Sequence, residues 1–253
     1  MTILDMFRLD DRVVIVTGAS SGLGVEFARA CADAGATVAL AARRVERLGE
    51  VASALEAEGH RVRTYRTDIV DPQECQGLVD RVMEDFGRID VLVNNAGIGT
   101  AHPAVRETPE QFREVIDINL NGSYWLAQAC GRVMGSGSSI INISSVLALT
   151  TAGLPQAAYS ASKAGLLGLT RDLAQQWSGR KGIRVNALAP GFFETEMTGQ
   201  YPEGYLDATL PRLLLARNGD PRELAATVVW LASDASGYVT GQTIVVDGGF
   251  TIS

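Results

Sequence analysis

Tyr159 and Lys163 form the pair whose residue types and spacing most directly suggest chemistry. They are four positions apart in a stretch with helical patterning, so both side chains lie on one face of the predicted helix. A free tyrosine has a pKa of roughly 10, and a nearby ammonium group lowers it by favouring the phenolate. Such a tyrosine can exchange a proton with a bound molecule near neutral pH. The same spacing also arises by chance, as a half-buried tyrosine beside a solvated lysine.

Two further polar residues are candidates for the same site. Ser145 directly follows a predicted strand, at the edge where open α/β sheets bind ligands, and its hydroxyl can hydrogen-bond a reacting carbonyl and hold its orientation. Asn119 interrupts an otherwise apolar helical stretch. From this pattern alone, Asn119 is either a member of a polar site or a residue that caps or kinks the helix.

A glycine-rich turn lies near the N-terminus, where the first predicted strand ends and a helix begins. Gly18, Gly22 and Gly24 allow a tight turn, close approach of the backbone to a pyrophosphate, and close packing of helix on strand. The start of the helix also offers free N–H groups and a partial positive charge. The turn therefore predicts a dinucleotide site, with an ordinary tight turn as the alternative.

The elements that must position these residues alternate between two kinds. Short β-branched runs predict seven strands: Arg12–Thr17, Thr37–Ala42, Arg61–Thr67, Ile89–Asn94, Ser139–Ser144, Ile183–Leu188 and Gln242–Val246. Longer amphipathic stretches predict helices: Leu23–Ala34, Val45–Glu58, Pro72–Phe86, Pro109–Met134, Ala157–Trp177 and Pro221–Leu231. Apolar strands alternating with helices imply right-handed crossovers and a parallel sheet. We expect a single α/β domain over residues 1–253, a Rossmann-type doubly wound parallel sheet of about seven strands with helices on both faces.

Composition excludes several classes of partner. Lys and Arg total 22 against 29 Asp and Glu, and the net charge of −7 argues against binding to nucleic acid or to an anionic membrane surface. The first residues lack the order of a signal peptide, and no apolar run approaches the roughly 20 residues that span a bilayer, so we expect a cytoplasmic protein. Cys31, Cys75 and Cys130 are far apart, and we expect reduced thiols and no metal site.

The glycine spacing, G-x3-G-x-G, is one of several ordered motifs through which the chain resembles the short-chain dehydrogenase/reductase (SDR) family. The others span nearly the whole sequence: Asn94-Asn95-Ala96-Gly97, Asn119-Leu-Asn-Gly122, Ile143-Ser144-Ser145, Tyr159-x3-Lys163, Pro190-Gly191, and Tyr238-Val-Thr-Gly241 with Val246-Asp-Gly-Gly249. The resemblance implies an NAD(P)(H)-dependent oxidoreductase that interconverts a ketone and a secondary alcohol by direct hydride transfer. It also implies a homotetramer.

The resemblance further implies roles for individual residues. Tyr159 is the general acid and base, Lys163 supports it, Ser145 rather than Ser144 orients the carbonyl, and Asn119 holds a water that links the lysine to solvent. Cofactor contacts are implied for Gly18, Ser20, Ser21, Gly22, Leu23, Gly24, Arg43, Asp68, Ile69, Asn95, Ala96, Gly97, Tyr159, Lys163, Pro190, Gly191 and Thr195. Two of these have structural alternatives, because Asp68 could instead cap the helix that begins at Pro72, and Thr195 could cap a lid helix.

The end of the second predicted strand bears on the choice of cofactor. An acidic residue there would bind the adenosine ribose of NAD, whereas an arginine accommodates the extra phosphate of NADP. This strand ends in Ala42 and is followed by Arg43 and Arg44, so NADP(H) is favoured and NAD(H) is possible. The alternative is that Arg43 stacks on the adenine or simply begins the next helix.

The loops at 98–105, 146–156 and 192–217 carry many apolar residues and no basic cluster, which favours a neutral, moderately apolar ketone or alcohol as substrate. Residues 192–217 are a predicted lid.

Three alternative functions stay open. A 3-oxoacyl-(acyl-carrier-protein) reductase is suggested by Pro190–Met197, although segment 131–138 offers only Arg132 to an acidic carrier protein. An inactive dinucleotide-binding sensor would keep the fold. A nucleotide-sugar epimerase or dehydratase would share Y-x3-K in a longer chain.

Overall fold

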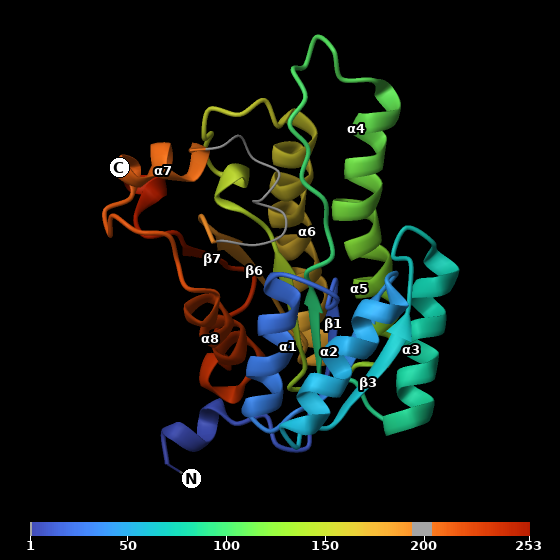
Figure 1. The fold of residues 1–253 in the computed structure, drawn as a ribbon. Helices are drawn as coiled ribbons and strands as arrows, with labels where there is room; N and C mark the ends of the chain where they lie inside the picture. Colours follow the sequence, from blue (N-terminus) through green and yellow to red (C-terminus); the bar gives the residue numbers. More distant parts are fainter. Residues whose placement is uncertain (1, 194–203) are drawn as a thin grey trace.

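Seven parallel strands form one sheet at the centre of the molecule (Figure 1). The computed structural model describes residues 2–193 and 204–253. Within them the strand order is β3-β2-β1-β4-β5-β6-β7, and every neighbouring pair is parallel. The strands are β1 (Val13–Thr17), β2 (Thr37–Ala42), β3 (Val62–Arg66), β4 (Val91–Asn94), β5 (Ser139–Ile143), β6 (Arg184–Pro190) and β7 (Thr243–Val246). The predicted Rossmann-type, doubly wound sheet is confirmed.

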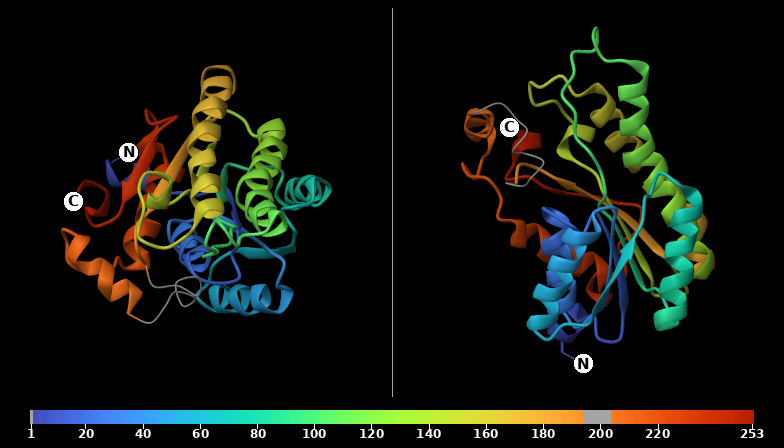
Figure 2. Two further views of the ribbon diagram at one scale, coloured as in Figure 1. Left: turned by 90° about the horizontal axis from the view of Figure 1, so that it is seen from above. Right: turned by 45° about the vertical axis from the view of Figure 1, so that its right-hand side comes forward.

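Helices cover both faces of the sheet, as Figure 2 shows from above and in an oblique view. On one face lie α1 (Leu23–Asp33), α2 (Val45–Ala57) and α8 (Pro221–Ala232). On the other lie α3 (Pro72–Phe86), α5 (Ser123–Val133) and α6 (Ala157–Lys181). Alternate residues of each strand supply the two cores, since Val14 and Val16 pack toward the first set of helices and Val13 and Ile15 toward the second. Burial on both faces explains the continuous apolar runs of these strands.

The predicted helix Pro109–Met134 is wrong as a continuous α-helix. The chain forms α4 (Pro109–Ile116), a π-helical segment (Asp117–Gly122) and then α5. A π segment inserts one residue into the backbone hydrogen-bond ladder without changing the apolar pattern, so the sequence carries no signal for it. The segment contains Asn119, which is fully buried.

Most other boundaries agree with the prediction to within one or two residues. The largest difference is at α6, which runs on beyond Trp177 to Lys181. The stretch predicted to be irregular, Gly191–Gly219, contains a short helix α7 (Tyr205–Thr209) followed by a 3-10 turn at Leu210–Arg212. Part of that stretch, including Thr195, lies outside the described residues.

The carboxyl ends of β1 and β4 form the crevice where the order of winding reverses. β1 lies between β2 and β4, so chain leaving β1 and chain leaving β4 turn to opposite faces of the sheet. Thr17 joins the two loops, because its Oγ1 accepts the N–H groups of Asn95 and Ala96, both at 3.0 Å. Open α/β sheets bind ligands at such a switch point.

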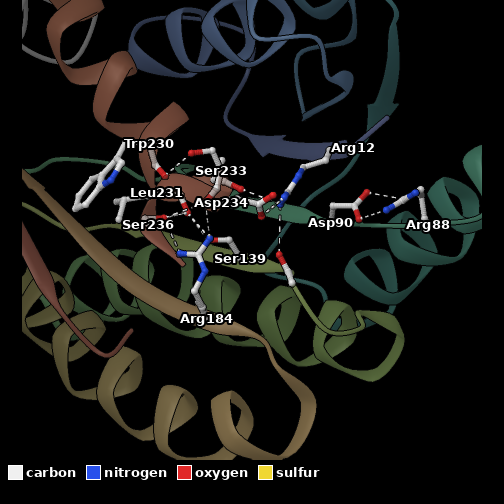
Figure 3. A network of polar contacts seen from close by, with 12 residues as sticks. Arg12, Arg88, Asp90, Ser139, Arg184, Trp230, Leu231, Ser233, Asp234 and Ser236 are labelled. Carbon is white, nitrogen blue, oxygen red and sulfur yellow. Dashed lines mark hydrogen bonds and ion pairs between the residues drawn. The ribbon is translucent and has the colours of Figure 1, made fainter. Parts of the chain in front are cut away.

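Two arginines lie at the amino ends of the strands, opposite the switch point (Figure 3). The guanidinium of Arg184, at the start of β6, donates to the carbonyls of Leu231 (3.0 Å) and Ser233 (3.1 Å) and to Oγ of Ser236 (2.8 Å). Arg12 donates to the carbonyl of Ala232 at 3.1 Å and pairs with Asp234. Together they bind the carbonyls at the C-terminal end of α8, which its own helical hydrogen bonds leave free. The two arginines thus hold the C-terminal end of α8 on the sheet, far from the switch point.

The three cysteines are buried and free, as predicted. Burial raises the pKa of the Cys31 and Cys75 thiols to about 12. No helix in the described part of the chain combines the length and apolar character needed to cross a bilayer.

Candidate active site

The glycine-rich turn after β1 has the backbone geometry that its sequence predicts. Gly18 and Gly22 have φ of +65° and +56°, in the region where other residues are strained. A Cβ at Gly18 would come within 2.9 Å of the Ala96 backbone, and one at Gly24 would overlap the carbonyl oxygen of Gly18. The turn therefore lies close against the loop after β4, and the N-terminus of α1 faces the crevice.

A cavity of about 500 Å³ opens along this crevice, within the size range of cofactor sites. Most of the predicted cofactor residues line it: Gly18, Ser20, Ser21, Gly22, Leu23, Arg43, Asp68, Ile69, Asn95, Ala96 and Gly97. Gly24 lies behind the turn. The glycine cradle, the helix N-terminus and the cavity fit a dinucleotide with its pyrophosphate against the start of α1.

Two guanidinium groups stand at the rim of this cavity beyond β2. Arg43 is exposed and lines the cavity, as predicted. Arg44 also lines it, and its guanidinium donates to Oγ of Ser20 at 3.2 Å and Oγ of Ser21 at 2.5 Å. Sequence reasoning singled out Arg43 alone. The signal that could have found Arg44 is the pair of serines in the glycine turn, which give a guanidinium two hydroxyl acceptors.

Asp68 lines the cavity and does not cap α3. The cap of α3 is Asp71, whose carboxylate accepts the N–H of Gln73 at 2.8 Å, so the capping alternative for Asp68 is wrong. Asp68 instead accepts the N–H of Val70 at 3.2 Å, and its own N–H donates to Glu74 at 2.7 Å. These bonds fix the loop that carries Asp68 and Ile69 against the cavity.

A second, smaller cavity of about 100 Å³ adjoins the first and shares Leu23, Asn95 and Gly97 with it. Its lining includes three of the four predicted catalytic residues, Ser145, Tyr159 and Lys163. They come from different elements, since Ser145 follows β5 and the other two lie on α6. The structure therefore brings them together at the carboxyl edge of the sheet.

Lys163 is buried beneath the ring of Tyr159. Its ammonium nitrogen lies 5.7 Å from the centre of that ring and donates to the carbonyl of Ile143 at 2.8 Å. Burial lowers the pKa of Lys163 to about 8, because the surroundings disfavour its charged form. Only 5% of the side chain is exposed, so its charge acts at short range on the groups of this cavity.

The two serines after β5 have different bonds. Ser144 Oγ donates to the carbonyl of Lys163 at 2.8 Å and so ties β5 to α6. Ser145 Oγ accepts the N–H of Leu147 at 3.1 Å, which leaves its own proton available to another acceptor. This difference agrees with the choice of Ser145 over Ser144.

Asn119 lies behind the cavity and braces the loop after β4. Its side-chain Oδ1 accepts the N–H of Ile98 at 2.8 Å, and its Nδ2 donates to the carbonyl of Ile98 at 2.9 Å and to Oγ of Ser162 at 3.1 Å. A Cβ at Gly97 would lie 3.0 Å from Oδ1 of Asn119 and 3.4 Å from the ammonium nitrogen of Lys163. Asn119 is thus packed into the same cluster as Lys163. Sequence reasoning missed Ser162, whose position within Tyr159-x3-Lys163 was the available signal.

Three comparisons place this arrangement among known proteins. A family model described as enoyl-(acyl carrier protein) reductase matches residues 18–251. The 3-oxoacyl-(acyl-carrier-protein) reductase FabG of Thermotoga maritima is 41% identical, over 97% of this chain and 100% of the relative. The D-threitol dehydrogenase of Mycolicibacterium smegmatis is 38% identical, over 97% of this chain and 95% of the relative. A gluconate 5-dehydrogenase of Burkholderia cenocepacia, solved with NADP and tartrate, is 35% identical over 100% of both chains, with a TM-score of 0.94.

The chain belongs to the short-chain dehydrogenase/reductase family. It is an NAD(P)-dependent dehydrogenase that acts on CH–OH groups. The nucleotide-sugar epimerase alternative is therefore set aside.

The walls of the smaller cavity in this dehydrogenase are apolar. Val146 and Leu147 form one wall, from the loop after β5, and Phe192 and Phe193 form another, from the segment after β6. Pro190 and Gly191, two of the predicted cofactor contacts, also line this cavity. The remaining predicted contact, Thr195, lies outside the described residues.

Proposed function

We propose that this dehydrogenase interconverts a neutral, moderately apolar ketone and the corresponding secondary alcohol, with NADP(H) preferred over NAD(H). The observation that carries the proposal is the placement of Lys163 under the ring of Tyr159, in a cavity that Ser145 also lines. This cavity opens beside the larger one that fits a dinucleotide. A proton donor, a carbonyl-orienting hydroxyl and a cofactor site thus meet at one point.

The proposed mechanism divides the chemistry between the cofactor and the chain. When bound, the nicotinamide supplies or accepts the hydride. Ser145 donates its hydroxyl proton in a hydrogen bond to the substrate oxygen and holds the carbonyl in place. Tyr159 gives its phenolic proton to that oxygen during reduction and takes it back during oxidation. The Lys163 ammonium stabilises the phenolate left on Tyr159.

In the proposed mechanism, Asn119 helps to hold the groups around Tyr159 and Lys163 in place. Its three side-chain hydrogen bonds hold the loop of Gly97 and Ile98 against Ser162 of α6, one residue before Lys163. The water-holding role implied by the family is part of the same proposal. Both functions place Asn119 outside direct contact with the substrate.

The preference for NADP(H) rests on the two guanidinium groups at the rim of the larger cavity. Arg43 is exposed there, and Arg44 is aligned by the hydroxyls of Ser20 and Ser21. A guanidinium makes charge-assisted, bidentate bonds to a phosphate. The gluconate 5-dehydrogenase with which this chain shares its fold was solved with NADP, which supports the same preference.

The lining of the smaller cavity supports a neutral substrate. Among its described lining residues, Lys163 alone carries a charge, and its ammonium bonds to Ile143. Val146, Leu147, Phe192 and Phe193 offer apolar surface. A carboxylate or phosphate on the substrate would find among these residues only the Lys163 ammonium, which is already bonded to Ile143, so little would offset its desolvation.

A 3-oxoacyl-(acyl-carrier-protein) reductase is the second candidate, favoured by the 41% identity to the reductase of that name from Thermotoga maritima. The only arginine of segment 131–138, Arg132, already donates to Gln76 at 2.9 Å and Gln128 at 3.0 Å. Docking of an acidic carrier protein would have to replace both bonds, which ranks this candidate second.

The test has two steps. Titrating the purified protein with NADPH and NADH, followed by cofactor fluorescence, gives the two affinities. The preferred cofactor is then mixed with cyclic ketones, aryl ketones, sugars and 3-oxoacyl thioesters, and the loss of reduced cofactor is followed by absorbance. Turnover of neutral ketones with tighter NADPH binding is the expected result, and turnover of 3-oxoacyl thioesters alone would favour the second candidate. Tight cofactor binding with no turnover of any class would favour a dinucleotide-binding sensor.

Two further expectations join the proposal. The first is that residues 192–217, within a single domain, act as the substrate lid. Their described part includes α7 and Leu213, which pack beside Phe192.

The second is that the chain assembles as a homotetramer, for which the exposed apolar side chains of Leu214, Leu215 and Val245 near the edge strand β7 offer contact surface. Light scattering of the purified protein measures its mass in solution.

A further inference from the structure

Phe250 is a fully buried aromatic residue just beyond β7 and is not among the residues that line the smaller cavity. The turn that places it is held by Asp247, whose carboxylate accepts the N–H groups of Gly249 at 2.9 Å and Thr251 at 2.8 Å. The N–H of Phe250 also donates to the Asp247 carbonyl at 3.2 Å, so Asp247 holds the backbone on both sides of the ring.

The ring of Phe250 packs against Phe192, which lines the smaller cavity. The two ring centres are 5.0 Å apart and the rings are nearly perpendicular, at 85°. Such edge-to-face pairs are a favoured aromatic geometry. The backbone beside Phe192 is held by the same segment, since the N–H of Gly191 donates to the carbonyl of Val246 at 2.9 Å and a Cβ at Gly191 would meet Asp247 at 2.7 Å. Both the ring and the backbone of this wall therefore rest on residues 246–250.

A third ring connects this wall to the opposite one. The ring centre of Tyr205, on α7, lies 6.2 Å from that of Phe192, and the Tyr205 hydroxyl donates to the carbonyl of Ala152 at 2.7 Å. Arg212 lies 4.1 Å above the ring of Phe250 and donates to the carbonyl of Thr151 at 3.2 Å. Thr151 and Ala152 belong to the loop that also carries Val146 and Leu147 of the facing wall. Figure 1 shows α7 beside the last residues of the chain.

We propose that Phe250 is a positioning residue that sets the width of the reaction cavity, and hence the size of ketone accepted. It does so by holding Phe192 against the cavity and by anchoring Arg212, which bonds to the facing wall. This inference rests on the proposed function, because it assigns the smaller cavity to the substrate. A smaller side chain at position 250 gives the Phe192 ring room to retreat, and the cavity widens without any change in Ser145, Tyr159 or Lys163.

Binding of alcohols to the NADPH complex tests this without requiring turnover, because an alcohol and the reduced cofactor cannot react with each other. The two probes are cyclohexanol and a secondary alcohol that carries a naphthyl group, titrated against the NADPH complex and followed by cofactor fluorescence. The variants are Phe250→Leu and, should that protein not fold, Phe250→Met, whose longer, unbranched side chain can follow more of the space left by the ring. The matched control is Phe27→Leu, a change at another fully buried phenylalanine that lies in the core on the α1 side of the sheet.

Phe250→Leu is expected to shift the affinity ratio of large to small alcohol by about tenfold in favour of the large one, the scale of one misfitted group in an apolar pocket. Phe250→Met shifts it in the same direction by less, and Phe27→Leu leaves it unchanged. In Phe192→Leu, the further change Phe250→Leu adds less than it does alone, because both act on the same wall.

An unchanged ratio in Phe250→Leu, or an equal shift in Phe27→Leu, overturns the inference. Failure of the proposed function looks different. The wild-type protein would then bind the alcohols with the expected ratios but would not reduce the matching ketones. Failure of the wild type to bind either alcohol contradicts both.

Discussion

The ammonium nitrogen of Lys163 donates a hydrogen bond of 2.8 Å to the main-chain carbonyl of Ile143. Ile143 is the last residue of β5 and is followed directly by Ser144 and Ser145. This bond, together with the one from Ser144 to the carbonyl of Lys163, locks α6 to the end of β5. The position of Ser145 relative to Lys163 is therefore set by two mutually supporting hydrogen bonds.

The buried charge of Lys163 makes stability depend on pH. The pKa of Lys163 is lowered by burial from 10.5 to about 8, so between these values the unfolded chain binds more protons than the folded one. The free energy of unfolding should therefore rise with pH across this window, by about 3 kcal/mol in total, as the cost of burying the ammonium disappears. Denaturant titrations of the wild type and Lys163→Met at a series of pH values measure this contribution as the difference between the two curves. Parallel curves would show that the lysine is not buried in its charged form.

The two arginines beyond β2 should select the cofactor. Arg43→Ala and Arg44→Ala are each expected to weaken NADPH binding about tenfold or more while leaving NADH binding almost unchanged, because each removes charge-assisted bonds to the extra phosphate. Fluorescence titration with both cofactors measures the affinities. Arg47→Ala is the matched control, since Arg47 is an exposed arginine of α2 that is not among the residues lining the cavity. Equal weakening of NADH and NADPH would instead assign Arg43 to the adenine.

Much of the fold could be predicted from the sequence, because the signals for it are local. β2 and α3 have the predicted bounds, since each has a continuous apolar or amphipathic pattern with a clear end, such as Pro72 at the start of α3. The cofactor crevice also followed from local patterns, because the three glycines of the turn lie within residues 18–24 and Arg43 directly follows β2.

The parts that could not be predicted depend on contacts between distant segments. The π segment around Asn119 changes hydrogen bonding and not composition. Which of two adjacent arginines turns toward Ser20 and Ser21 depends on how the loop after β2 packs on the glycine turn. The contact between Phe250 and Phe192 joins the chain after β7 to the chain after β6, and no periodicity in either segment indicates it.

The arginine network at the amino ends of the strands should contribute to the free energy of unfolding and not to cofactor binding (Figure 3). Arg184→Met leaves the buried carbonyls of Leu231 and Ser233 without their guanidinium donor, and a loss of about 3 kcal/mol in the free energy of unfolding is expected. Arg88→Met removes an exposed ion pair with Asp90 and should cost less than about 1 kcal/mol. Denaturant titration compares the two variants, and NADPH affinity should equal that of the wild type in both. A loss of NADPH affinity in Arg184→Met would show that the amino ends of the strands are energetically coupled to the cofactor site at their carboxyl ends.

The central claim is that Tyr159 transfers the proton, and the most direct test is single-turnover reduction of the preferred ketone by NADPH in Tyr159→Phe. The change removes the phenolic hydroxyl and keeps the ring that packs over Lys163. We predict a rate at least about 10³-fold lower than in the wild type, the scale of general acid catalysis, with NADPH affinity unchanged. A single-turnover rate close to that of the wild type would contradict the assignment of Tyr159 and, with it, the proposed mechanism.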